Sequence, residues 1–270
     1  MTLLQRRDIV TRLRAAGCVF AEDEARLLVS AGLEPADLAA SVERRVSGEP
    51  LEHILGWVEF AGLRIAVEAG VFVPRRRTEF LVRQAVSVTT TTSTRAVVLD
   101  LCCGSGAVGV AVAVALDGAE LHAGDIDPSA VHCARRNLPP VGGRVYEGDL
   151  FDALPRELIG RVDVLVANAP YVPTGDVRLL PPEARLHEAR TALDGGPDGL
   201  DVVRRVAGGA PQWLAPRGHL LVECSAQQVA QVVEAYARSG LVPRVVQSRS
   251  DDSEATVVVG AMTDSRGKDG

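Results

Sequence analysis

The chain has 270 residues, of which 47% are hydrophobic, and its formal net charge at pH 7 is −6. This length accommodates one large domain and a small one, and the acidic balance argues against a broad nonspecific surface for nucleic acid. The five cysteines are scattered without CxxC spacing, which favours free thiols over a disulfide framework or a zinc site. Early charges disfavour a signal peptide, and no apolar stretch reaches the roughly 20 residues that span a bilayer. We therefore expect a cytoplasmic protein without a membrane segment.

Helical spacing characterises the N-terminal part of the chain. Between residues 3 and 47, apolar residues recur at helical intervals in three runs, which end at Gly17, Gly32 and Gly48. From Glu52 to Val73 the pattern changes to short alternating runs, which predict a β-hairpin. We expect a helical substrate-recognition domain at residues 1–50 and a β-hairpin linker at residues 51–77.

Apolar strands alternate with helical segments from residue 78 onward. The sequence predicts helices at 78–88, 106–116, 128–137, 199–213 and 226–239, and strands at 96–101, 120–125, 144–147, 162–167, 218–224, 242–248 and 254–261. This alternation is typical of an α/β fold with a doubly wound parallel sheet, and the last two strands indicate an antiparallel edge hairpin. The polar run at 89–94 predicts a surface loop, and residues 263–270 a disordered tail after a domain at 78–262.

Glycines follow the first strand of the predicted sheet, in the run Asp100-Leu101-Cys102-Cys103-Gly104-Ser105-Gly106. Gly104 and Gly106 allow the backbone to approach a ligand closely, and the next helix offers free N–H groups. Such turns also occur for packing alone, so this segment by itself is a weak indication of a cofactor site.

Acidic residues close the next two strands. Asp125 lies about 20 to 25 residues after the loop, where dinucleotide-type sites hold ribose hydroxyls, although an acid there can also serve a helix N-terminus. We assign ribose binding to Asp125 and helix capping to Asp127, which precedes Pro128. Asp149, followed by Leu150, is placed to accept a hydrogen bond from an adenine amino group.

A polar tetrapeptide, Asn168-Ala169-Pro170-Tyr171, follows the apolar strand at 162–167. The carboxyl ends of strands are where open α/β sheets place their ligands. The structural alternative is an Asx-turn, which is common for asparagine near proline.

Together these segments resemble the motif series of class I, Rossmann-like S-adenosylmethionine-dependent methyltransferases. A nicotinamide enzyme would be expected to have a fuller G-x-G-x-x-G loop, which this chain lacks. The resemblance implies S-adenosyl-L-methionine as cofactor. It also implies a binding set of Asp100, Cys102, Cys103, Gly104, Ser105, Gly106, Asp125, Asp149, Leu150 and Asn168.

Over about residues 5 to 262 the chain is similar to the HemK/PrmC-type protein-(glutamine-N5) methyltransferases. The similar segments are residues 44–56, Val73–Glu79, which matches Ile-Pro-Arg-Pro-x-Thr-Glu, and Ala192–Leu200, which matches Ala-Leu-x-Gly-Gly-x-Asp-Gly-Leu. The resemblance implies methyl transfer to the side-chain amide of a glutamine in a protein. Family members act on the Gly-Gly-Gln loop of peptide release factors or on a ribosomal protein.

The family's Asn-Pro-Pro-Tyr motif implies catalytic roles for Asn168, Ala169, Pro170 and Tyr171. An amide nitrogen is a poor nucleophile because its lone pair is delocalised, so its N–H bonds must be held with the lone pair facing the methyl group. The Asn168 side-chain oxygen would accept one N–H and the Ala169 carbonyl the other. Tyr171 would pack against the substrate plane, and Pro170 would keep residue 169 extended.

Alanine or arginine replaces the family's proline at three positions: Ala169, Arg76 and Ala189. At 169 the backbone gains freedom worth roughly 0.4 to 1 kcal/mol, while the carbonyl is retained. These departures leave open a paralogue with another protein target. Arg75, Arg77 and Glu79 either hold the hairpin against the sheet or line the substrate groove, and Glu223 is similarly ambiguous.

Two further functions remain open at this point: N-methylation of adenine or guanine in nucleic acid, with Arg75–Arg77 as its best support, and S-adenosylmethionine binding without turnover. The acidic balance weighs against direct binding of nucleic acid. The five histidines are dispersed without metal spacing. We expect a monomer that acts on a glutamine-presenting protein, either a release factor or another translation protein, and that uses no metal.

Overall fold

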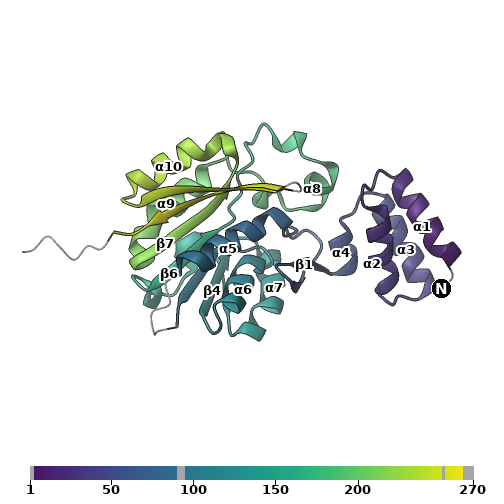
Figure 1. The fold of residues 1–270 in the computed structure, drawn as a ribbon, viewed down its shortest axis with the longest axis horizontal. Coiled ribbons are helices and arrows are strands. Elements are labelled where there is room, and N and C mark those ends of the chain that lie inside the picture. Colours follow the sequence, from purple (N-terminus) through teal and green to yellow (C-terminus); the bar gives the residue numbers. More distant parts are fainter. Residues whose placement is uncertain (1–2, 90–94, 251–252, 264–270) are drawn as a thin grey trace, which may run out of the picture.

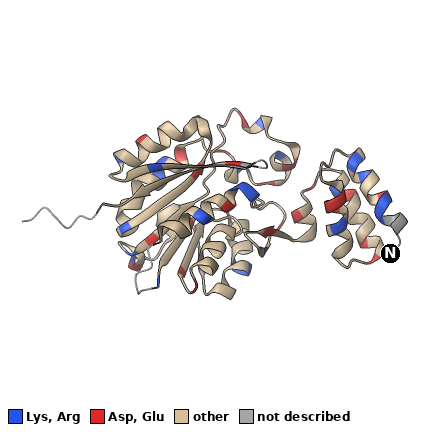
Figure 2. Ribbon diagram, in the orientation of Figure 1, with Lys and Arg blue, Asp and Glu red and all other residues tan. Residues whose placement is uncertain are grey.

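The computed structural model describes residues 3–89, 95–250 and 253–263. Most of the predicted threonine-rich loop and of the predicted tail lies outside these residues. Lys and Arg are interspersed with Asp and Glu over both the N-terminal helices and the larger sheet-containing part of the molecule (Figure 2). None of the helices in the described ranges is long and apolar enough to cross a membrane.

Three helices form a bundle at one end of the molecule, shown in purple in Figure 1. They are α1 (Leu3–Ala15), α2 (Ala21–Ser30) and α3 (Pro35–Val46). Their inward faces share a small apolar cluster that includes Leu13, Leu28 and Val42. The helices predicted from spacing are therefore present, and Pro35 takes the first turn of the third, where its missing N–H costs nothing.

A short helix and a hairpin connect this bundle to the sheet. The predicted hairpin is present, as β1 (Trp57–Phe60) and β2 (Leu63–Ala66), paired antiparallel. The prediction was wrong at its start, because Leu51–Leu55 form helix α4 instead. Gly56 ends that helix in the left-handed region with φ 77°. A five-residue helix is too short for its spacing to differ visibly from a strand pattern.

Seven strands form the main sheet, in the order β5-β4-β3-β6-β7-β9-β8. Their bounds are β3 Val97–Leu101, β4 Glu120–Asp125, β5 Arg144–Glu147, β6 Val162–Ala167, β7 Leu214–Cys224, β8 Val242–Ser250 and β9 Ser253–Ala261. The first five pair in parallel, and β9 runs antiparallel to both β7 and β8. This confirms the doubly wound sheet with an antiparallel edge. Because the strand order reverses between β3 and β6, a crevice is expected at their carboxyl ends.

Helices cover both faces of the sheet. One face carries α5 (Glu79–Val88), α6 (Ala107–Ala115) and α7 (Pro128–Asn137), and the other carries α9 (Asp201–Trp213) and α10 (Val229–Arg238). Alternate residues of β3 serve the two faces: Val98 packs in the first core, and Leu99 and Leu101 pack in the second. Asp100 falls on the same face as Val98, toward α6.

The start of one strand differs from the prediction by several residues, and one helix was not predicted. Strand β7 begins at Leu214 rather than 218, and Leu214 pairs with Val162 across a register shift. Pro216 and Gly218 are typical turn residues, so this part of the strand had no strand signature. The long connection from β6 to α9 also contains an unpredicted helix, α8 (Pro182–His187).

Candidate active site

A cavity lies at the carboxyl ends of β3, β4 and β6, and it brings most of the predicted site residues together. Those that line it are Asp100, Cys102, Cys103, Gly104, Ser105, Asp125, Asp149, Leu150, Asn168 and Pro170. Segments distant in sequence form the remaining wall, among them Val71–Thr78 and Ala189–Asp194. Of the predicted residues, Gly106, Ala169 and Tyr171 do not line the cavity.

The turn after β3 depends on left-handed backbone at Cys102, Gly104 and Gly106, with φ of 54°, 55° and 78°. A Cβ on Gly104 would meet nothing within 4 Å, so the backbone there is open to a ligand. A Cβ on Gly106 would instead collide with the side chain of Leu138. The first glycine thus suits ligand approach, and the second is required by the packing of α6.

Asp100 is 1% exposed, and its Oδ2 accepts the backbone N–H of Gly109 at 2.8 Å. Burial, with a smaller contribution from the nearby charge of Asp125, raises the pKa of Asp100 to about 7. The carboxyl group therefore exchanges its proton near neutral pH.

Asp125 accepts backbone N–H groups with both carboxylate oxygens, from Gly104 at 2.8 Å and from Asp127 at 2.9 Å. Each oxygen keeps a second lone pair that can accept a ribose hydroxyl. Burial raises the pKa of Asp125, and these two N–H groups oppose that rise. Asp127 caps α7 by accepting the Ser129 N–H, as predicted from the sequence.

At the far end of the cavity, Asp149 pairs with Arg205 at 2.8 Å. Arg205 comes from α9 and also lines the cavity, together with Val202. Sequence reasoning missed both residues, because α9 has an ordinary amphipathic pattern that gives no sign of a ligand.

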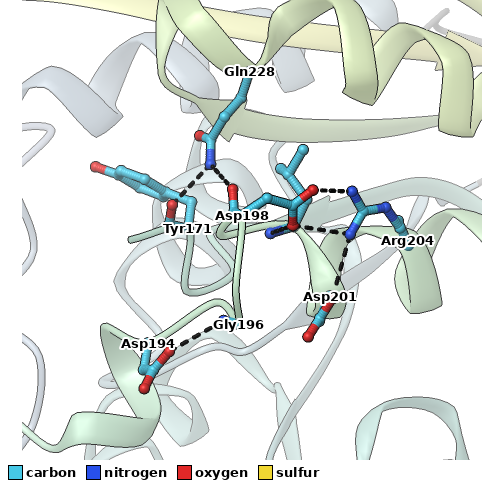
Figure 3. A network of polar contacts seen from close by, with 8 residues as sticks. Tyr171, Asp194, Gly196, Asp198, Asp201, Arg204 and Gln228 are labelled. Atoms are coloured by element: carbon cyan, nitrogen blue, oxygen red, sulfur yellow. Dashed lines mark hydrogen bonds and ion pairs between the residues drawn. The ribbon is translucent and has the colours of Figure 1, made fainter. Parts of the chain in front are cut away.

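Asn168 is the first residue after β6, and it lines the cavity beside Pro170. Within the described part of the chain, no hydrogen bond occupies the Asn168 side-chain amide, so both its donor and its acceptor remain available. Ala169 is buried, at 1% exposed. The Tyr171 hydroxyl accepts from Arg77 Nη2 at 2.5 Å, and the Tyr171 carbonyl accepts from Gln228 Nε2 at 2.9 Å (Figure 3).

The two segments of the remaining wall are tied together by Glu188. Its buried Oε1 accepts the Val73 N–H at 3.1 Å and also pairs with Arg75. Next to it, the Ala189 N–H donates to Gly70 O at 3.0 Å. Glu79 accepts the N–H of Ala61 in the hairpin turn at 3.1 Å. The sequence left two roles open for Arg75, Arg77 and Glu79: holding the hairpin against the sheet or lining the substrate groove. These contacts support the first, structural role.

Thr78 is a functional candidate that the sequence analysis did not single out, although it lies in the family-like segment 73–79. Among residues 3–89, 95–250 and 253–263, neither its hydroxyl nor that of Ser105 has a hydrogen-bond partner, and both residues are 2% exposed and line the cavity. Unpaired buried hydroxyls are costly, and a polar ligand would pair them. With the open backbone at Gly104 and the acids on β3 and β4, they fit the polar amino-acid and ribose parts of S-adenosylmethionine.

Comparisons with known proteins agree with this geometry. Residues 63–215 match the family model of the methyltransferase small domain. The release factor glutamine methyltransferase of Geobacter sulfurreducens is 41% identical over 213 residues, covering 77% of this chain and 73% of that protein. A 4-amino-L-phenylalanine/4-methylamino-L-phenylalanine methyltransferase of Streptomyces pristinaespiralis is 37% identical, covering 74% of this chain and 69% of that protein.

Among solved structures, a methyltransferase from Pyrococcus furiosus superposes with a TM-score of 0.55 at 15% identity, over 75% of this chain and 90% of its own. This likeness supports the class I methyltransferase fold. S-adenosylmethionine is thus the methyl donor that the fold and the relatives imply. The chain belongs to the HemK/PrmC family of release factor glutamine methyltransferases.

Proposed function

We propose that this protein transfers a methyl group from S-adenosylmethionine to the side-chain amide nitrogen of a glutamine in a peptide release factor. The observation that carries the proposal is the position of Asn168, whose unpaired amide lines the same cavity as the predicted cofactor residues. When bound, S-adenosylmethionine supplies an electrophilic methyl group on a sulfonium centre.

The protein's own contribution is positioning. The Asn168 side-chain oxygen and the adjoining Ala169 carbonyl, which we call the amide clamp, accept the two N–H bonds of the substrate amide. Asn168 lines the cavity and Ala169 does not, so the substrate amide has to reach past the lining to the Ala169 carbonyl. When the amide is held in this way, the nitrogen lone pair faces the methyl group. The reaction is then favoured because the two reacting groups are already oriented. Asp125 holds the ribose of the cofactor, and Asp149 lies at the end of the cavity that we assign to adenine.

We assign substrate recognition to the helical bundle at the N-terminus. Val19 and Phe20, in the turn between α1 and α2, are 84% and 70% exposed. The bundle is tied to the cavity wall through Arg45, which pairs with Glu24 at 2.6 Å and with Glu183 of α8 at 3.6 Å. The exposed apolar turn and this link to α8 are the two observations that support the assignment. Phe20→Ser should raise KM for the intact protein substrate and leave KM for a short glutamine peptide unchanged.

The test is a transfer assay with radiolabelled S-adenosylmethionine and purified release factor, followed by mass spectrometry of the methylated peptide. The wild type should add a single 14 Da increment to glutamine. Asn168→Ala should abolish transfer while cofactor affinity by calorimetry stays within about threefold, because the amide contacts substrate. Full activity of this variant would refute the clamp.

Parallel acceptors separate the remaining alternatives. One specific observation favours a second candidate, since the 37% identical Streptomyces relative is named for an amine on an aromatic ring, another planar conjugated nitrogen. Transfer to 4-amino-L-phenylalanine but not to release factor would favour that candidate, and transfer to RNA or DNA would favour a nucleic-acid enzyme. Cofactor binding with no transfer to any of these acceptors would indicate a non-catalytic binding protein. Sedimentation of the same sample tests the expected monomer.

A further inference from the structure

Tyr171 follows the amide clamp, and its hydroxyl end is held by Arg77, a partly exposed side chain that also pairs with a buried carboxylate. Arg77, from the segment before α5, donates to the hydroxyl through Nη2 at 2.5 Å and to Glu223 Oε1 through Nε at 3.1 Å. Glu223, in β7, is 3% exposed, and Arg77 is the ion-pair partner of that buried carboxylate. Neither residue lines the cavity. Removing the guanidinium would therefore release the ring without removing a cofactor contact.

The backbone end of Tyr171 is held by the side chain of Gln228. Its Nε2 donates to Tyr171 O at 2.9 Å and to Asp198 O at 3.1 Å (Figure 3). Its Oε1 accepts from the Ser225 hydroxyl at 2.9 Å. The amide can face only one way, because both of its N–H bonds meet carbonyls and its oxygen meets donors. Gln228 is 7% exposed, so water cannot readily replace these bonds.

The glycine-rich segment 194–200 packs against the same stretch of backbone. Gly195 N–H donates to Val172 O at 2.9 Å, and a Cβ on Gly195 would lie 2.6 Å from Pro170 O. A Cβ on Gly199 would overlap Tyr171 O and lie 2.6 Å from Gln228 Nε2. Only glycine allows this approach, so Gln228 bridges two backbones that are already in contact.

This support matters because of the residue at position 169. The family's proline would fix φ there through its ring, whereas alanine leaves φ free. The direction of the Ala169 carbonyl must then be set by what holds the residues beside it. Asn168 is anchored by β6 on one side, and on the other side Pro170 and Tyr171 are anchored by the contacts described above.

We propose that Arg77 and Gln228 are positioning residues of the amide clamp: they fix Tyr171 at its hydroxyl and at its carbonyl, and through it the carbonyl of Ala169. The inference rests on the proposed function. Loss of either side chain should lower kcat about ten- to a hundredfold, since a displacement of about 1 Å at a reacting centre has that effect. Affinity for S-adenosylmethionine should stay within twofold.

The experiment measures kcat and KM for release factor, cofactor Kd and melting temperature for Arg77→Ala, Gln228→Ala and Gln228→Glu. The glutamate variant keeps the size of the side chain but sets a carboxylate oxygen against two carbonyls, so it should lose kcat at least as strongly as the alanine variant. The exposed neighbours Arg76→Ala and Gln227→Ala are matched controls, and both should retain wild-type kcat.

A double-mutant cycle tests the route through Tyr171. If Arg77 acts on the hydroxyl, Tyr171→Phe should reproduce most of the kcat loss of Arg77→Ala, and the double variant should be no slower than the slower single variant. If the kcat loss of the double variant equals the product of the two single losses, the route through the Tyr171 hydroxyl is overturned. Wild-type kcat in folded Arg77→Ala and Gln228→Ala would overturn the proposal, as would losses matched by equal losses in cofactor affinity. Wild type and Asn168→Ala in the same assay report on the proposed function independently.

Discussion

Asp100 is buried beside the predicted cofactor turn, and Asp100→Asn removes its charge while keeping an oxygen for the Gly109 N–H. The pKa of the folded protein's Asp100 is about 7, against the ordinary value of 3.8 for the unfolded chain. Between these two values the folded state binds a proton that the unfolded state has lost. Stability therefore falls as pH rises through this window and levels off above it.

From pH 5 to pH 8, the two pKa values give a loss of about 2 to 3 kcal/mol in the free energy of unfolding. Cofactor binding should have the opposite pH dependence, because an ionised carboxylate attracts the positively charged S-adenosylmethionine. Affinity should therefore rise with pH below about 7 and become constant above it. The residue would thus reduce the stability of the empty protein under the same conditions in which it strengthens binding.

Urea unfolding and calorimetric titration at pH 5, 6, 7 and 8 measure both effects. In Asp100→Asn the pH-dependent loss of stability should be smaller by about 2 to 3 kcal/mol, and the affinity should be weaker and independent of pH. Asp163→Asn is a control, because Asp163 accepts the Val97 N–H at the amino ends of β3 and β6, away from the cavity at their carboxyl ends. Wild-type slopes in Asp100→Asn would refute the assignment of the titration to Asp100.

Four further substitutions test other parts of the site. Asp125→Ala should weaken S-adenosylmethionine binding by about tenfold or more, measured by calorimetry, through loss of charged hydrogen bonds. Asp127 also lines the cavity, but Asp127→Ala should mainly remove a helix cap, at about 1 kcal/mol of unfolding free energy, and should weaken binding less; equal affinities of the two variants for the cofactor would remove the ribose assignment. Gly199→Ala should lower methyl transfer severely, because a Cβ would overlap the Tyr171 carbonyl, and an unimpaired rate would contradict the close approach. Ala189→Pro should lose the bond to Gly70 O, at about 0.5 to 1.5 kcal/mol in denaturant unfolding, partly offset by about 0.4 to 1 kcal/mol because proline suits the φ of −61° at this position; a net gain of stability by the full offset would mean that the bond contributes nothing.

The sheet and the cofactor side of the cavity could be predicted because their signals are local. Apolar runs identified β3, β4 and β6, and the residues at their carboxyl ends, such as Asp100, Asp125 and Asn168, had to meet at one edge of a parallel sheet. The Asp127 cap was equally readable, since Asp-Pro at a helix start carries its own signature.

The supporting contacts could not be predicted, because they depend on tertiary packing between distant segments. Arg77 reaches Tyr171 across 94 positions, and Gln228 reaches it across 57. Arg77 lies in the family-like segment 73–79, whose pattern does not name its partner, and Gln228 lies in a segment whose pattern indicates only a helix start. The same limit applies to Arg205, and to the helix at 51–55, where Gly56 ended a segment too short to show a period.

The replacement of proline by alanine has opposite effects on the backbone at 169 and at 189: it loosens the backbone at 169 and adds a hydrogen bond at 189. At 169 alanine frees a backbone angle next to the amide, and the contacts of Tyr171 with Arg77 and Gln228 compensate from outside. At 189 alanine supplies an N–H that proline lacks, and this N–H bonds to Gly70 O at 3.0 Å. This bond connects the loop 189–194 to the residues that precede the other wall segment, Val71–Thr78. Because the clamp carbonyl is retained while the contacts of the cavity wall change, the replacements should affect which glutamine the site accepts more than the transfer of the methyl group.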